Sequence, residues 1–139
     1  MDHLRLETRV PIAFSMTTST TKRVELQQRF IVFAADIIAL SEKLPESRQG
    51  RHHCGQMLRS GTATAANYGE ARGAESRSDF VHKLGIVLKE LNETAIWLEL
   101  IVRSAIVGAE KVAPVVAENS ELCRIITASI KTTRGSIDR

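Results

Sequence analysis

The sequence predicts an all-α protein, folded as an antiparallel up-down-up-down four-helix bundle. Apolar residues recur every three to four positions over four long stretches, which is the period of an amphipathic helix. No stretch alternates apolar and polar residues as a half-buried strand would. The connections between the stretches are short, so consecutive helices are expected to be antiparallel neighbours. A chain of 139 residues fits one such domain.

The first helix is expected from about Lys22 to Leu44. Thr20 or Thr21 can cap it, because a hydroxyl accepts a free backbone N–H of the first turn. Pro45 ends it, since the residue before a proline is disfavoured in the helical conformation. One stripe carries Leu26, Phe30, Phe33, Ile37, Leu40 and Leu44. Further apolar residues at 31, 34, 35 and 38 make the apolar surface wider than one neighbouring helix requires.

The second helix is expected over residues 47–72, with Gly73 as its C-cap. Its apolar face includes several small residues, which allow two helix backbones to approach closely. Gly61 and Gly69 each cost about 1 kcal/mol of helix propensity relative to alanine. Close packing against a neighbouring helix is the expected compensation at both positions.

The third helix is expected to begin at Ser76 and to run to about Val102. Asp79 stands three residues after Ser76, so the pair forms a capping box that satisfies free N–H groups. The helix carries one apolar stripe, made of Phe80, Leu84, Val87, Leu91, Leu98 and Ile101.

The fourth helix is expected over residues 112–133, after a break at Gly108. Pro114 suits its first turn, where a backbone N–H has no partner within the helix. Gly135 is expected to stop the helix. Its apolar stripe contains Val115, Val116, Leu122, Ile126 and Ile130.

The composition is typical of a globular protein, and the chain divides into three predicted parts. We expect residues 1–20 to be a flexible N-terminal extension, residues 21–134 the bundle domain, and residues 135–139 a C-terminal tail. An apolar fraction of 43% with 25% charged residues excludes an intrinsically disordered chain. The net charge is +3 and the pI about 9.1, but no segment is a basic block. A monomer would therefore bind polyanions weakly, whereas a ring of copies would combine several modest basic patches.

Charged residues interrupt the apolar runs that export or membrane insertion requires. The first eleven residues carry four charges, and no apolar run reaches the ~20 residues that span a bilayer. We therefore expect a cytoplasmic protein without membrane contact. Two cysteines, Cys54 and Cys123, are too few for a disulfide scaffold, and both are expected to stay reduced.

The sequence contains no pattern typical of an enzyme, a metal site or a cofactor site. It has no Gly-rich phosphate loop, Gly-x-Ser-x-Gly elbow, His-Glu-x-x-His or Glu-x-x-His. His52, His53 and Cys54 are consecutive, so on a helix they point about 100° apart and do not converge on one ion. His82 would join them only if it approached across the bundle. We therefore expect no catalysis, no metal and no cofactor.

Polar residues on the second and third helices form a predicted cluster. Arg59 and Glu70 are eleven residues apart, about three turns, and Asn67 lies between them. Glu90 lies on the antiparallel partner. A cluster of these four residues would fix the register of the two helices, because a buried charge requires a partner. Trp97, the one tryptophan, is a candidate for an oligomer interface, with an ordinary core position as the alternative.

Residues 56–100 carry a more specific pattern. The chain resembles the bacterial "four helix bundle protein" family, also called the 23S rRNA-intervening-sequence protein family, over about residues 26–133. The matching residues are Gln56, Leu58, Arg59-Ser60, Ala66-Asn67-Tyr68, Glu70-Ala71, Glu75-Ser76, Asp79-Phe80, His82-Lys83-Leu84, Leu88-Lys89-Glu90, Glu93 and Trp97-Leu98. The resemblance implies a left-handed bundle and a homopentameric ring. Some members are encoded within insertions in 23S rRNA genes, and distant relatives assist the reverse transcriptase of diversity-generating retroelements.

Two hypotheses follow from this resemblance and the basic pI. The first is a non-enzymatic oligomeric scaffold that binds RNA, DNA or a nucleic-acid-processing enzyme. The second is a protein-interaction scaffold without a nucleic-acid role, which the near-balanced charge of every segment favours. The expected nucleic-acid contacts of the first hypothesis are Arg48, Arg51, Arg72, Arg77, Lys83, Lys89, Lys131 and Arg134.

Overall fold

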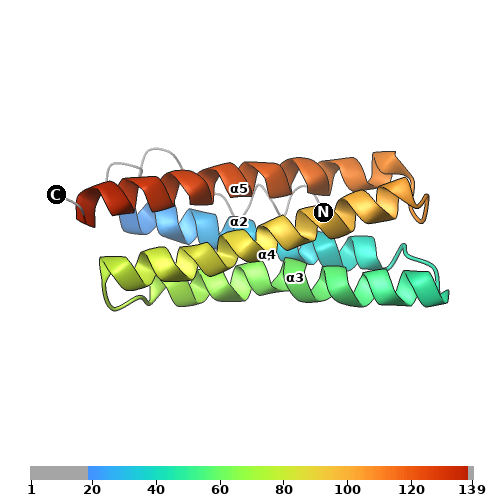
Figure 1. Cartoon of the computed structure of the whole chain (residues 1–139), viewed down its shortest axis with the longest axis horizontal. Coiled ribbons are helices and arrows are strands. Elements are labelled where there is room, and N and C mark those ends of the chain that lie inside the picture. The colour runs from blue at the N-terminus through green and yellow to red at the C-terminus, as the bar shows by residue number, and fades with distance from the viewer. Residues whose placement is uncertain (1–18, 138–139) are drawn as a thin grey trace.

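The computed structural model describes residues 19–137, which form four α-helices and no strand (Figure 1). The helices are α2 (Ser19–Ser41), α3 (Arg48–Arg72), α4 (Arg77–Arg103) and α5 (Ala109–Ile137). The predicted all-α four-helix fold is confirmed. The expected N-terminal extension lies outside the described residues except for its last two positions, which already belong to α2.

Consecutive helices run in opposite directions, as the colour gradient along them shows (Figure 1). Contacts between α2 and α3 report the same reversal, since Gln27 meets Arg72 while Ser41 meets Cys54. Each helix packs against its neighbours in sequence, and a smaller contact between α2 and α5 closes the bundle. The left-handed turn of the bundle stays a prediction.

A single apolar core runs along the bundle axis. Its fully buried side chains come from all four helices: Phe30, Phe33, Ile37, Met57, Leu84, Val87, Leu91, Leu98, Ile101, Val112, Leu122 and Ile126. The rings of Phe30 and Tyr68 stack with centroids 5.0 Å apart. Burying a large aliphatic or aromatic side chain contributes about 1.5–3 kcal/mol, so these stripes hold the helices together. The stripes match those read from the helical period except at Val116, which is 43% exposed and does not belong to the core.

The first helix starts and ends earlier than its sequence predicts. α2 begins at Ser19, so Thr20 and Thr21 lie within its first turn and not before it. It ends at Ser41 because the chain tightens there. The N–H of Lys43 bonds to the carbonyl of Leu40 at 3.0 Å. This tighter type of turn closes a helix end. The helix therefore stops three residues before its expected end at Leu44, ahead of Pro45.

The caps of α3 and α4 follow the sequence closely. Ser47 Oγ accepts from the N–H of Gly50 at 3.1 Å, and Ser76 Oγ accepts from the N–H of Asp79 at 3.0 Å. Asp79 reaches back to the N–H of Glu75, at 3.1 Å, one residue beyond the position that a standard capping box predicts. Gly73 caps the end of α3 as expected, with a negative φ of −92°.

The last helix is longer than predicted at both ends. α5 begins at Ala109, so Pro114 lies in the second turn and not in the first. Val107 and Val112 are both buried, and their burial draws the preceding loop onto the core and starts the helix early. Gly135 does not stop the helix, which continues to Ile137. Its expected role as a helix stop was wrong.

The two glycines expected to allow close packing differ in their surroundings. A Cβ at Gly61 would lie 2.8 Å from Cγ2 of Ile37, so α2 and α3 approach closely there. A Cβ at Gly69 would meet only Nε2 of Gln27, at the ordinary distance of 3.8 Å. Close packing therefore explains Gly61, and it does not explain Gly69.

Candidate nucleic-acid interface

A groove of about 300 Å³ lies at the end of the bundle where α3 turns into α4. The antiparallel arrangement brings the start of α2 and the end of α5 to the same place. The groove is lined by Arg23 of α2, by Ala71 and Arg72 of α3, by Ala74 and Ser76 of the turn, by Arg77 and Phe80 of α4, and by Thr132 and Thr133 of α5. Three guanidinium groups and several hydroxyl groups line this space, and none of the lining residues between positions 19 and 137 is acidic.

Two of the arginines are held in place by neighbouring side chains. Cζ of Arg23 lies 5.0 Å from the ring centre of Phe80, within the range of a cation–π contact. Nη1 of Arg72 donates to Oε1 of Gln27 on α2. Beneath them, burial raises the pKa of Tyr68, and the positive charges of Arg23 and Arg72 partly oppose that rise. The contacts with Phe80 and Gln27 therefore fix the guanidinium groups of Arg23 and Arg72 in the groove.

The positive charge of the chain is concentrated at this end. We define the basic end as residues 22–29, 66–86 and 126–135. It contains eight basic and four acidic side chains, a net charge of +4, of which one unit, that of Arg29, is paired with Glu118 just outside these ranges. Residues 30–65 and 87–125 contain eight basic and nine acidic side chains, a net charge of −1. The near-balance of consecutive segments therefore conceals a charge asymmetry that appears only when the helices are folded together.

Asp79, one of the acidic residues at the basic end, already accepts hydrogen bonds from two neighbouring groups. The backbone N–H of Glu75 and the ammonium of Lys83 both hydrogen-bond to Asp79, and together they lower the pKa of its carboxyl group. Nζ of Lys83 lies 3.2 Å from Oδ2 of Asp79. Lys83 thus contributes less to the outward field than the groove arginines do.

The structure separates the eight expected contact residues into two groups. Five belong to the basic end: Arg72, Arg77, Lys83, Lys131 and Arg134. The other three do not. Arg48 and Arg51 lie at the opposite end of α3, and Lys89 lies near the middle of α4.

Sequence reasoning missed Arg23, which lines the groove. The one indication in the sequence was that Arg23 follows Lys22 in the expected first turn of the first helix. Nothing local indicated that this turn would meet the end of α3, because that contact joins residues far apart in the chain.

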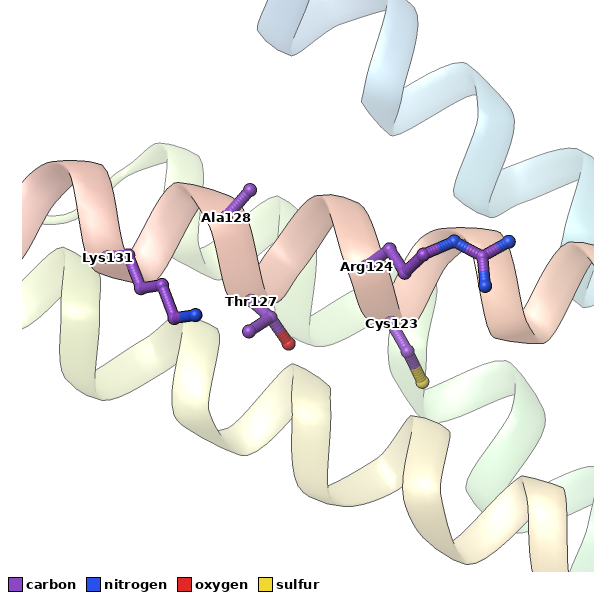
Figure 2. Close-up of a pocket in the computed structure, with 5 residues that line it drawn as sticks. All are labelled: Cys123, Arg124, Thr127, Ala128 and Lys131. Carbon is purple, nitrogen blue, oxygen red and sulfur yellow. The ribbon is translucent and has the colours of Figure 1, made fainter.

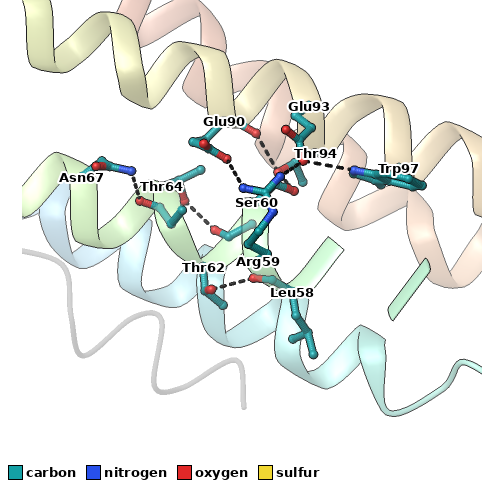
Figure 3. A network of polar contacts seen from close by, with 12 residues as sticks. Leu58, Arg59, Ser60, Thr62, Thr64, Asn67, Glu90, Glu93, Thr94 and Trp97 are labelled. Atoms are coloured by element: carbon teal, nitrogen blue, oxygen red, sulfur yellow. Dashed lines mark hydrogen bonds and ion pairs between the residues drawn. The ribbon is translucent and has the colours of Figure 1, made fainter. Parts of the chain in front are cut away.

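The predicted polar cluster forms only in part (Figure 3). Arg59 contacts both Glu90, at 3.5 Å, and Glu93. Asn67 donates instead to the carbonyl of Ala63 on its own helix, at 2.9 Å. Glu70 is exposed on α3, and the structure does not bring it to the other three residues. The Arg59 side chain is 53% exposed, so these ion pairs lie at the surface and not in the core.

Trp97 extends the same surface network. Its indole Nε1 donates to Oε2 of Glu93 at 3.2 Å, and its ring contacts those of His52 and His53 with centroids 5.7 and 5.5 Å apart. Burial opposes ionisation of Glu93, but hydrogen bonds from Arg59 and Trp97 outweigh it and lower the pKa of the carboxyl group. Trp97 itself is half-buried, between a core and a surface position.

A buried hydrogen bond beneath this network also escaped the sequence reasoning (Figure 3). Oγ1 of Thr94 donates to Oγ of Ser60 at 2.9 Å, and both residues are fully buried. Thr94 lies 2.8 Å from the carbonyl of Glu90 as well. This hydrogen bond joins α3 to α4 inside the core, where the sequence predicts only apolar contacts.

The histidines do not assemble a metal site. His52 and His53 contact Trp97, while His82 lies fifteen residues earlier on α4, about 22 Å along a helix. Across residues 19–137, no three or more His, Cys, Asp and Glu residues are grouped so that they could hold a metal ion. No helix in this range is long and apolar enough to cross a membrane.

A second hollow lies along α5, beside Cys123 (Figure 2). Its lining residues are Cys123, Arg124, Thr127, Ala128 and Lys131, all from one helix. Burial raises the pKa of the Cys123 thiol, so this cysteine is not activated as a nucleophile. The hollow lacks the convergence of charges from several helices that distinguishes the groove.

Comparisons with known proteins identify the family of this fold. The family model described as 23S rRNA-intervening sequence protein matches residues 22–128. A crystal structure of a protein of unknown function, from the S23 ribosomal protein family of Bacteroides thetaiotaomicron, is 36% identical with a TM-score of 0.71. That match covers 76% of this chain and 97% of the other. No curated protein matches. The chain belongs to the 23S rRNA-intervening sequence protein family.

Proposed function

We propose that this protein is a non-enzymatic, homo-oligomeric helical bundle that binds RNA or DNA through its basic end. One observation carries the proposal: three arginines from three helices line one groove, at the end that holds the positive charge of the chain. Arginine suits this role because its planar guanidinium matches the oxygens of a phosphate group. Membership of a family named for an rRNA intervening sequence agrees with a nucleic-acid partner.

The charge of one copy sets how strongly it can bind. Affinity for nucleic acid grows with the number of phosphates neutralised and falls as salt rises. A net charge of +4 at one end gives weak binding to a single copy. Several copies in a ring would present several such ends to one strand, and linked sites bind far more tightly than one site alone.

Exposed apolar side chains support the oligomer. Ile31 and Ile38 on the outer face of α2 are 45% and 48% exposed, and Ile96 on α4 is 60% exposed. Contacts with other copies would remove these side chains from water, at about 25 cal/mol for each Å² buried. We propose the homopentamer that the family resemblance implies. Light scattering on the purified protein tests it, with Ile96→Glu expected to lower the mass and Glu99→Lys, on the same helix, as the exposed control.

A salt series tests nucleic-acid binding directly. Purified protein is titrated against structured RNA and duplex DNA from about 50 to 200 mM salt, the range over which several phosphate contacts weaken steeply. We expect Arg72→Glu with Arg77→Glu to abolish binding. The matched control is Arg48→Glu with Arg51→Glu, which changes the same charge at the opposite end of α3 and should retain binding.

Each outcome of this series has a definite meaning. Thermal unfolding of both double variants shows whether the fold survives the charge reversal. Equal loss of binding in folded variants of both pairs would remove the basic end as the interface. Absence of binding at the lowest salt would refute the nucleic-acid function, because electrostatic affinity is greatest there.

A protein-interaction scaffold is the second candidate, and the exposed isoleucines of α2 and α4 favour it. Such a surface would bind a protein partner, including a nucleic-acid-processing enzyme, through apolar contacts. A partner captured equally at low and high salt, and lost in Ile38→Glu, would support this function. Capture that disappears with salt or after nuclease treatment would favour the nucleic-acid function.

A further inference from the structure

We propose that residues 10–16 fold back along the outer face of α2 as an extended segment and cover its exposed isoleucines. Two features carry this proposal: an apolar stripe on α2 that faces away from the core, and an apolar segment tethered directly before the helix. The contact goes beyond the proposed function, because it forms within one chain. It takes the place of a second copy on α2 and leaves Ile96 of α4 to the contacts between copies.

The outer face of α2 carries an apolar stripe that the described residues leave open. Ile31 and Ile38 are large exposed side chains, and the exposed Ala35 lies between them. Their spacing of four and three residues places all three on one side of the helix. Phe30 and Ile37, one position earlier in each case, are fully buried and face the core. The stripe is therefore a second apolar face of α2, and such faces mark contact sites.

The chain directly before α2 has the pattern of a covering segment. Residues 10–16 read VPIAFSM and carry no charge. Large apolar side chains occupy every second position, at Val10, Ile12, Phe14 and Met16, with a smaller residue between each pair. Because the side chains of an extended chain alternate between its two sides, all four would face the same way. One side of the segment is therefore apolar, as a cover for an apolar stripe requires.

Pro11 favours an extended segment over a longer helix. A proline disfavours the helical conformation at the residue before it, here Val10. Its fixed φ also reduces the number of conformations open to the free segment, so less entropy is lost when the segment docks. The family match begins at residue 22, so the segment precedes the part of the chain that the family model matches.

The length of chain before Ser19 lets the segment reach the stripe. Along α2, Ile31 lies about 18 Å and Ile38 about 29 Å from Ser19, at about 1.5 Å per residue. An extended chain advances about 3.3 Å per residue. With two residues used for the reversal, Ile12 lies about 17 Å and Val10 about 23 Å back along the helix. These side chains therefore come level with the region that starts at Ile31 and runs toward Ile38.

The tether favours this segment over any free occupant of the stripe. A segment joined to the start of α2 by a few residues meets the stripe at an effective concentration in the millimolar range. Another copy of the protein in dilute solution does not reach that concentration. The stripe is therefore covered from within the chain, and the contact does not depend on the concentration of the protein.

Chymotrypsin tests the contact at the peptide bond after Phe14, because its specificity pocket is hydrophobic. Cleavage requires a released segment, so its rate follows the population in which the segment is undocked. Mass spectrometry of the full-length protein follows the product that begins at Ser15, and a synthetic peptide of residues 8–20 gives the rate for a free segment. We expect cleavage in the protein to be about tenfold slower than in the peptide, at every protein concentration.

Variants locate the docking site. Ile31→Asp with Ile38→Asp should raise the rate to within about twofold of the peptide, because charged side chains repel the apolar segment. The matched control, Ile96→Asp with Leu100→Asp, places two charges on the exposed face of α4 and should keep the slow rate. Thermal unfolding confirms that both double variants are folded. Ile12→Asp leaves the bundle unchanged and should also remove the protection, measured against a peptide with the same substitution.

Each outcome has a definite meaning. Cleavage of the wild-type protein at the rate of the peptide would overturn the proposal. Protection that survives in Ile31→Asp with Ile38→Asp would overturn it too, because α2 would not be the docking site. Protection that disappears on dilution, or in the α4 control, would assign the segment to a neighbouring copy and overturn the contact within one chain. These measurements contain no nucleic acid, so their failure is distinct from a failure of the proposed function.

Discussion

The close approach of α2 and α3 at Gly61 gives the sharpest test of the packing. An alanine Cβ there would lie 2.8, 2.9 and 3.2 Å from Cγ2, Cγ1 and Cδ1 of Ile37. Unstrained carbon atoms sit about 3.5–4.0 Å apart, so the helices or the Ile37 side chain must move by more than about 0.5 Å. Ile37 is fully buried and branched at Cβ, which leaves it little freedom to turn away.

Two opposing terms set the size of the effect. Gly61→Ala gains about 1 kcal/mol of helix propensity. Overpacking a tight core costs about 1–3 kcal/mol, and the rigid neighbour places this site at the upper end. We expect a net loss of about 1–2 kcal/mol in the free energy of unfolding. Gly55→Ala is the matched control on α3. Its Cβ would meet nothing within 4 Å, so it should stabilise the protein by up to about 1 kcal/mol.

Urea denaturation at one fixed protein concentration measures both variants, since oligomerisation makes stability depend on concentration. The two alanine variants should differ by about 2–3 kcal/mol. Ile37→Ala should cost less in the Gly61→Ala background than in the wild type, because the added methyl group then fills part of the space. If Gly61→Ala is as stable as Gly55→Ala, the close approach of the two helices is refuted.

Three further predictions follow from local contacts. Gly50→Ala should cost more than about 2 kcal/mol by urea denaturation, because its Cβ would lie within 3 Å of the Pro45 backbone; wild-type stability would refute this clash. The folded pKa of Glu93 is below its unfolded value near 4.5, so its stabilising effect is present above that value and is lost as pH falls through the folded pKa. Glu93→Gln should therefore weaken the dependence of the melting temperature on pH between about pH 5 and 3. An unchanged pH dependence would contradict the Arg59 contact. Thr94→Val should cost about 1–3 kcal/mol by chemical denaturation, because it leaves a buried serine hydroxyl without its partner; a neutral effect would show that this hydroxyl finds another.

Local features of the sequence were sufficient for the helices and most of their caps. The helical period placed the core residues because one apolar stripe must face the other helices whatever their arrangement. Ser47 and Ser76 were readable as caps since each bonds to a backbone N–H three residues away. The ends that were misplaced, at Ser41 and around Pro114, depend on how the connecting loops pack onto the core.

The candidate site was only partly readable, because it depends on contacts between distant segments. The sequence by itself determined the four amphipathic helices, the overall basic charge and the resemblance that named the family. The tertiary structure alone decided that Arg23 lies beside Arg72 and Arg77 while Arg48 and Arg51 lie at the far end. Helical periodicity is a property of neighbouring residues, whereas the juxtaposition of charges follows from which helix ends meet when the apolar stripes are buried together.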